Sequence, residues 1–114
     1  FFKNKREKEE KKIRQHPIII MEGILMLHYI RLHKFYTLKV FVETPEHIRI
    51  NRRLERDIHF RGRTKESIEK QYYSTVKPMH KKFVQPSKSY SDVVIEGTVS
   101  IDKSISQIKS KIDL

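Results

Sequence analysis

Three short runs of mainly apolar residues, many of them β-branched, alternate along the chain with longer stretches whose apolar residues recur at helical spacing. The runs cover residues 18–21, 38–42 and 92–96. Such runs are typical of strands buried on both faces of a parallel sheet. Strands that alternate with helices are joined by right-handed crossovers, which place helices on the faces of the sheet. The sequence therefore predicts an α/β fold with a parallel sheet and flanking helices.

Three helices are expected between and after these strands. The first should begin with Thr44 as N-cap, Pro45 as the first helical residue and Glu46 in the first turn, and run to about residue 60. Pro78 lies inside the second helix and is expected to kink or break it. The apolar face that predicts this second helix consists of Ile68, Tyr72, Val76, Met79 and Phe83. A last helix is indicated by the spacing of Ile101, Ile105, Ile108 and Ile112.

The segment 49–63 carries six arginines in fifteen positions. Arg49, Arg53 and Arg56 fall on one side of the predicted helix. Gly62 allows a sharp turn after the helix, which would bring Arg61-Gly62-Arg63 beside that set. A polyanion is the expected partner. The alternative is a surface helix with weak salt bridges to Glu55 and Asp57, and two acids would leave most of six arginines unpaired.

Charge and composition narrow the class of protein without choosing a ligand. A net charge of +11 and a pI of about 10.0 fit nucleic acid, an acidic membrane face or phosphorylated small molecules as partners. The 114 residues suit one small domain. The chain has no cysteine, which excludes a disulfide framework and is compatible with a cytoplasmic protein. The apolar runs are far too short to cross a bilayer, so no membrane partner is expected.

Five ordered motifs lie between residue 16 and about residue 96. They are residues 18–25 (IIIMEGIL), 39–44 (KVFVET), 53–64, 71–80 and 86–95. Together they resemble the uridine-cytidine kinases, in which the first two end core strands, the third is the lid and the last leads into another core strand. The sequence Arg-Asp-x-x-x-Arg-Gly-Arg followed by Gln-Tyr favours this nucleoside branch over the related phosphoribulokinases.

The resemblance implies an enzyme that phosphorylates uridine or cytidine to the 5′-monophosphate in pyrimidine salvage, with ATP or GTP as donor and Mg²⁺ as cofactor. Arg56 and Arg61 match catalytic arginines that contact the donor phosphates. Arg53, Arg63 and Gln71 match residues that bind the nucleoside. By the same resemblance the protein is expected to form a homotetramer, and nucleic acid is not an expected partner.

Glu22 is the expected metal ligand. It follows the predicted strand 18–21, and ligands of open α/β sheets gather at the carboxyl ends of strands. A carboxylate at that place can hold Mg²⁺ directly or through water. The matching glutamate of the family has this role. Without the resemblance, a polar residue that merely ends a strand is the simpler interpretation.

The phosphate-binding loop of such kinases is missing. No G-x-x-x-x-G-K-[ST] sequence occurs, and the three glycines, Gly23, Gly62 and Gly97, are far apart. The family's general base also lies outside the matched region. The fold class is therefore a partial P-loop kinase-like sheet without the P-loop strand, and the chain alone is expected to be inactive. Residues 17–114 are predicted to be the C-terminal part of the kinase domain, with an arginine-rich lid at about 56–66.

The absent strand has a consequence for stability. In the family it lies between the strand that ends at Glu22 and the strand that ends at Glu43. Two exposed edges in the middle of an apolar sheet favour aggregation or rearrangement. Residues 1–114 in isolation are thus expected to be poorly stable.

Residues 1–16 form a polar, basic arm. Lysines and glutamates spaced four apart permit a solvated helix or a flexible arm, and a nucleic-acid-binding tail is an alternative. By resemblance the arm is the remnant of the nucleoside-binding segment, Phe-x-x-His-x-Arg, and Asn4 stands where the family has histidine. The alternative function for the whole chain is a non-catalytic basic module that binds nucleotides or nucleic acid.

Overall fold

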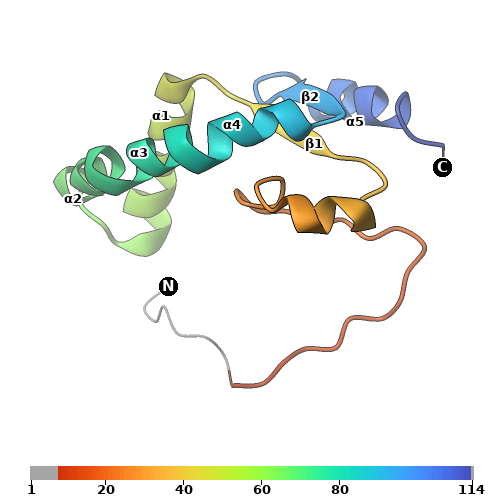
Figure 1. Cartoon of the computed structure of the whole chain (residues 1–114). Helices are drawn as coiled ribbons and strands as arrows, with labels where there is room; N and C mark the ends of the chain where they lie inside the picture. Colours follow the sequence, from red (N-terminus) through yellow and green to blue (C-terminus); the bar gives the residue numbers. More distant parts are fainter. Residues whose placement is uncertain (1–7, 114) are drawn as a thin grey trace.

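The computed structural model describes residues 8–113 and has a parallel sheet with flanking helices (Figure 1). The sheet consists of β1 (Val40–Glu43) and β2 (Val93–Glu96). The strands are parallel and in register, with Val40 opposite Val93 and Glu43 opposite Glu96. The predicted α/β class is confirmed. Within residues 8–113 the sheet has only these two strands.

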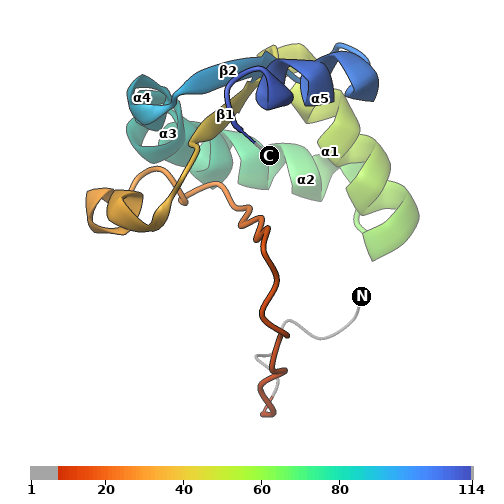
Figure 2. The ribbon, with the colours of Figure 1, turned by 90° about the vertical axis from the view of Figure 1, so that its right-hand side faces the viewer.

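Helices cover both sides of this sheet. The helix α1 (Glu46–Arg61) follows β1 directly, and α5 (Ile101–Lys109) follows β2. Figures 1 and 2 show the strands between α5 and a long helical run that begins with α2 (Lys65–Gln71). Side-chain bonds agree with this arrangement, because Gln107 of α5 donates to the Val94 carbonyl at 3.0 Å. The 3₁₀ helix η1 (Ile30–Phe35) precedes β1.

The long helical run continues through both of its prolines. Pro78 does not break it, contrary to one of the predicted outcomes. A π-helical segment precedes each proline by two residues, and a wider turn at that place accommodates the missing N–H and the ring. After α2 the segments are η2 (Tyr72–Val76, π), α3 (Lys77–Met79), η3 (His80–Val84, π), α4 (Gln85–Ser87) and η4 (Lys88–Tyr90, 3₁₀).

The core is small and lies where the strands meet the helical run. Ile68 and Tyr72, on the predicted apolar face, are buried, whereas Met79 on that face is half exposed. The start of α1 differs from the prediction by one residue: Pro45 is the N-cap, and no side chain caps the helix. The N-cap of α5 is Ser100, whose hydroxyl accepts from the Lys103 amide. The buried apolar residues are Phe41, Ile68, Tyr72, Val93 and Ile95.

The strand expected at residues 18–21 is not formed. Ile18, Ile19, Ile20 and Met21 are 51 to 86% exposed and belong to neither helix nor strand. A strand needs a neighbour to bond its backbone groups, and among residues 8–113 β1 pairs only with β2. By the resemblance, the P-loop strand would lie between residues 18–21 and β1 and would be the partner of this segment.

The polar arm is exposed wherever it is described. Residues 8–16 form neither helix nor strand, so the solvated helix is absent there. The predicted nucleoside-binding remnant, with Asn4, lies outside the described residues. Among residues 8–113, no helix combines the length and the apolar character needed to cross a membrane.

Candidate functional site

The junction between α1 and α2 brings the lid residues together. Gly62 ends α1 in the left-handed conformation, with φ 60° and ψ 27°. The amides of Gly62 and Arg63 both donate to the Asp57 carbonyl, the latter at 3.1 Å. Thr64 then caps α2, since its hydroxyl accepts from the Ser67 amide at 3.2 Å. This tight reversal places the arginines on either side of Gly62 against the last turns of α1.

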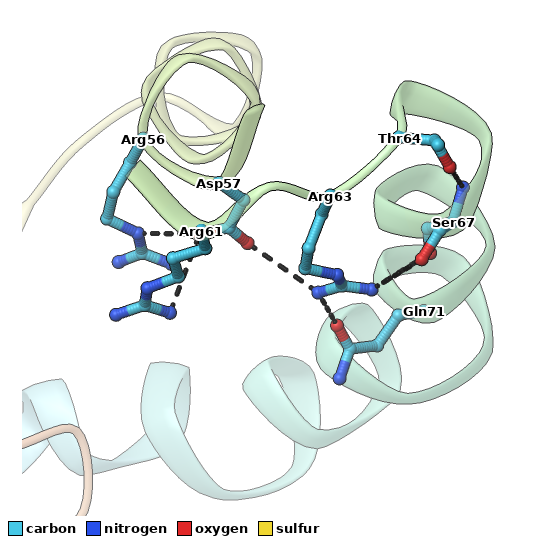
Figure 3. Close-up of polar contacts among 7 residues, drawn as sticks. All are labelled: Arg56, Asp57, Arg61, Arg63, Thr64, Ser67 and Gln71. Carbon is cyan, nitrogen blue, oxygen red and sulfur yellow. Dashed lines mark hydrogen bonds and ion pairs between the residues drawn. The ribbon is translucent and has the colours of Figure 1, made fainter. Parts of the chain in front are cut away.

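Asp57 lies at the centre of these arginines (Figure 3). Its side chain is only 1% exposed. Arg56 donates from Nε to Oδ1 at 2.9 Å, and Nη1 of Arg61 lies 3.5 Å from the same oxygen. Nη1 of Arg63 lies 3.6 Å from Oδ2. One buried carboxylate thus gathers three of the predicted site arginines.

Arg63 also bonds the beginning and the end of α2. It donates from Nη1 to the side-chain oxygen of Gln71, and from Nη2 to the hydroxyl of Ser67 at 2.9 Å and to its carbonyl at 3.3 Å. Figure 3 shows Arg63 between Asp57 on α1 and these two residues on α2. Arg63 and Gln71, which were both predicted to bind a nucleoside, are therefore direct neighbours.

The charges in the cluster change the pKa of its members. Burial raises the pKa of the Asp57 carboxyl, but the hydrogen bond from Arg56 and the charges of Arg56, Arg61 and Arg53 outweigh it, so the pKa is below its ordinary value. Burial and the charge of Arg56 lower the pKa of the half-buried Arg53. Arginine remains cationic even so. The charge of Arg53 thus interacts with those of Arg56 and Asp57, which places Arg53 in the same charged cluster.

Two of the six arginines have other partners. Arg49 donates from Nε to the Thr44 carbonyl at 3.0 Å, and Arg52 donates to the Gly97 carbonyl at 3.1 Å. Both bonds fasten α1 to the loops that follow the strands. The salt-bridge alternative is thus observed at Asp57, where three arginines share a single acid, but that acid is buried rather than on the surface.

Glu22 is not brought to this cluster by any contact in the described structure. It is exposed and lies in a segment without helix or strand. Across residues 8–113, no group of three or more histidine, aspartate or glutamate side chains could hold a metal ion. Glu22 therefore has no second protein carboxylate beside it in such a group, and its predicted metal role stays a prediction.

Glu46 links α1 to the helical run, a role that was not predicted from the sequence. It accepts from the Tyr72 hydroxyl and from Lys77 Nζ, both at 3.1 Å. The hydrogen bonds from Lys77 and Tyr72 lower the pKa of the Glu46 carboxyl. Glu46 was interpreted only as a first-turn acid, because partners 26 and 31 residues away leave no local signal.

A second missed cluster lies at the carboxyl end of β1. Glu43 forms a 2.8 Å ion pair with Lys88 and accepts from Gln85 at 3.3 Å. His80 lies 3.1 Å from the Gln85 side-chain oxygen. The hydrogen bond from Lys88 lowers the pKa of Glu43. The available sequence signal was a carboxylate at the carboxyl end of a predicted strand, which is the signal that predicted a site role for Glu22.

Comparison with known proteins adds a family to this geometry. The family model described as "Phosphoribulokinase / Uridine kinase family" matches residues 1–104. A protein named uridine kinase from Clostridium novyi (strain NT) is 41% identical over 113 residues, covering 96% of this chain and 54% of the relative. One of the same name from Streptococcus equi subsp. zooepidemicus is 50% identical over 101 residues, covering 87% and 49%.

A third relative gives the same proportion. The uridine kinase of Lactiplantibacillus plantarum is 44% identical over 109 residues, covering 90% of this chain and 52% of its own length. The chain thus spans about half the length of the curated relatives it matches.

Proposed function

Because the chain belongs to the phosphoribulokinase and uridine kinase family, we propose that it is the lid-bearing half of an enzyme that transfers the γ-phosphoryl group of ATP or GTP to the 5′-hydroxyl of uridine or cytidine. Residues 17–114 would form the C-terminal part of the kinase domain, with the lid at about 56–66. The enzyme would act in cytoplasmic pyrimidine salvage, as a homotetramer.

The observation that supports this proposal best is the shared position of Arg56, Arg61 and Arg63 around Asp57, with Gln71 bonded to Arg63. A set of arginines on a simple solvated helix would be spread along it. Here residues from two helices and their junction converge on Asp57. The Gln71 amide beside them could form hydrogen bonds with a polar ligand.

Arg56 and Arg61 would bind the phosphates of the donor. Phosphoryl transfer develops charge on the equatorial oxygens of the transferred group, and fixed cations close to them stabilise that charge. Arg56 uses Nε for Asp57, so that contact does not involve its two terminal nitrogens. A guanidinium presents donors in a planar fork that suits phosphate oxygens.

Arg53, Arg63 and Gln71 would bind the nucleoside. Arginine can donate to two ribose hydroxyls or to a base edge, and glutamine can donate and accept. The bonds that Arg63 makes to Gln71 and Ser67 hold its guanidinium in one orientation. An oriented donor loses less entropy when it binds its ligand.

Closure of the lid over both substrates would exclude water and prevent wasteful hydrolysis of ATP. Magnesium, when bound, would screen the phosphate charges of the donor. Glu22 would give it one carboxylate ligand, and its remaining ligands would be donor phosphates and water. The phosphate loop and the general base would have to come from sequence outside this chain.

The test is a chimera that joins this chain to the half of the Streptococcus equi relative that it does not match. We expect the chimera to convert uridine and ATP to uridine monophosphate. Replacement Arg63→Ala should abolish this activity, whereas Arg52→Ala should retain it, because the one partner of Arg52 among residues 8–113 is the Gly97 carbonyl, away from the lid. An inactive chimera that folds would count against the proposal.

The same variants distinguish the proposed kinase role from the alternative of a non-catalytic basic module. Binding to RNA through phosphates alone would weaken by similar amounts in Arg52→Ala and Arg63→Ala, and would fall steeply with salt. A kinase lid predicts that Arg63→Ala removes phosphorylation but barely changes affinity for RNA.

A further inference from the structure

Asp57 is an acid in a position where burial is costly. Its side chain is 1% exposed, and an ionised carboxylate removed from water needs strong compensation. Hydrogen bonds and nearby positive charges provide it. Three guanidinium groups around one carboxylate give these four side chains a net charge of +2. The cluster is stable in this form only because Asp57 stays ionised.

The two oxygens of Asp57 contact different groups. Oδ1 contacts Arg56 and Arg61, which are proposed to bind phosphate. Oδ2 faces Arg63, which is proposed to bind the nucleoside. A single rigid carboxylate therefore stands between the arginines of the two proposed subsites.

The backbone of the same residue holds the lid in place. The Asp57 carbonyl accepts from the amides of Gly62 and Arg63. Asp57 thus fixes where the lid leaves α1 and also where the Arg63 guanidinium lies.

Oδ2 has hydrogen-bonding capacity in reserve. It is buried, and its 3.6 Å distance to Arg63 Nη1 is longer than a hydrogen bond. An anion that draws Arg56 and Arg61 away from Oδ1 would leave more of the carboxylate charge for Arg63. A shorter Arg63 contact would then offset the loss of the bonds at Oδ1.

We propose that Asp57 is a positioning residue that couples the two subsites, so that phosphate bound by Arg56 and Arg61 changes the position of Arg63. This inference rests on the proposed function for the identity of the ligands. The contacts that carry it belong to this chain alone, and they can be tested without a reaction.

The first test is NMR spectroscopy of the arginine Nε–Hε groups of this chain within the chimera, titrated with inorganic triphosphate. In the wild type, the Nε–Hε resonances of Arg56 and Arg61 should shift when triphosphate binds, and the Arg63 resonance should shift as well. In Asp57→Asn the response of Arg63 should be lost. Glu55→Gln removes the same charge from an exposed position of α1 and should leave the response unchanged.

Each outcome decides a separate claim. If Arg63 responds equally in Asp57→Asn and in the wild type, the coupling is refuted. If no arginine responds to triphosphate, the proposed phosphate role fails, and the ligand-free spectra decide the positioning role. Asp57→Asn must then shift the resonances of all three arginines, and unchanged resonances would overturn the inference.

A second variant covers the case in which Asp57→Asn does not fold. Arg56→Lys keeps the charge but removes the Nε bond to Oδ1. In the described structure Arg56 and Arg63 both contact the Asp57 carboxylate and not each other, so the inference predicts that Arg56→Lys shifts the Arg63 resonance. An unshifted Arg63 resonance would overturn the inference.

The chimera gives a binding test through a double-mutant cycle, which needs no turnover. Asp57→Asn should raise the dissociation constant for uridine, measured by calorimetry, about tenfold when Arg63 is present, and less than about twofold when Arg63 is already alanine. A merely structural role predicts the same factor in both backgrounds, and that result would contradict the coupling.

Discussion

The guanidinium of Arg63 and the side-chain amide of Gln71 are bonded to each other, eight residues apart, across the first two turns of α2. The bond joins the lid to the helix that follows it. Gln71 is exposed, so the pair is also open to a ligand. The two residues therefore act as one unit, and a change at one should be felt at the other.

Replacement of Gln71 by alanine tests this unit. The hydrogen bond involves a charged donor and is worth about 1.5–3 kcal/mol when both partners are held. We expect the KM for uridine of the chimera to rise roughly tenfold, and the KM for ATP to stay within about twofold. Steady-state kinetics with each substrate varied in turn would measure both values.

The matched control is Gln107→Ala, which removes an amide of the same size from α5. Gln107 bonds the Val94 carbonyl, away from the lid. Its replacement should leave the KM for uridine unchanged. Equal effects of the two substitutions would mean that Gln71 acts through general stability and not through Arg63.

A second prediction concerns Gly97, which follows β2. A Cβ atom at this position would overlap Thr44 Oγ1 and lie 3.2 Å from Val42 Cγ1. Gly97→Ala should therefore destabilise the chimera by about 1–3 kcal/mol, as overpacking does. Thermal unfolding followed by circular dichroism would show a lower Tm.

Gly62 provides the comparison. It is left-handed, with φ 60°, but apart from its neighbours along the chain no described residue has an atom within 4 Å of an added Cβ. Gly62→Ala should cost only about 1 kcal/mol through backbone strain. A larger loss of stability from Gly62→Ala than from Gly97→Ala would show that the close contact at Gly97 relaxes easily.

The sequence predicted the parts of this structure that depend on local spacing. The two strands around residues 40–43 and 93–96, the helix that carries the arginines, and the burial of Ile68 and Tyr72 all follow from periodicity. The convergence of Arg56, Arg61 and Arg63 was expected from Gly62. Their roles toward substrates remain predictions.

Features that depend on distant partners were not predictable in the same way. The prediction of a strand at residues 18–21 was wrong. A strand needs a neighbour, and a local sequence pattern cannot show whether one is present. Pro78 was expected to kink or break its helix because a proline lacks the backbone N–H. The π-helical segment that accommodates it has no sequence signal. The burial of Asp57 was not predicted, and only the alternative of a surface helix assigned it a role, as an exposed acid, because charge patterns do not reveal burial.

The pKa of His80 provides a third prediction. Burial and the charge of Arg49 lower this pKa from its ordinary value of 6.5, and they outweigh the raising effects of Gln85, Glu43 and Glu46. NMR titration of the ring should give a midpoint below 6.5. A midpoint at or above that value would contradict the half-buried position of His80 beside Arg49.

The direction of this pKa change also sets a pH dependence. The unfolded chain takes up the proton first as the pH falls below 6.5, so the folded state loses stability there. Above 6.5 the contribution of His80 to stability is complete. His80→Gln should remove this part of the pH dependence, and His47→Gln, at an exposed position of α1, should not.

The last prediction concerns the 114-residue chain by itself. The described residues form a sheet of two strands, and five of their apolar side chains are buried. Several large apolar side chains are exposed, including Ile19 at 72%, Ile20 at 86% and Val42 at 58%. Apolar surface of this kind gives no stabilisation until it is covered.

We therefore expect the isolated chain to unfold over a broad temperature range, without a single sharp heat-capacity peak, and to bind the apolar dye ANS. The chimera supplies the strand that the resemblance places beside β1, so it should unfold in one cooperative transition and bind less dye. Calorimetry of both proteins at equal concentration would compare them. A sharp transition of a monomeric 114-residue chain would contradict this prediction, because it would mean that two strands and their helices form a complete cooperative unit.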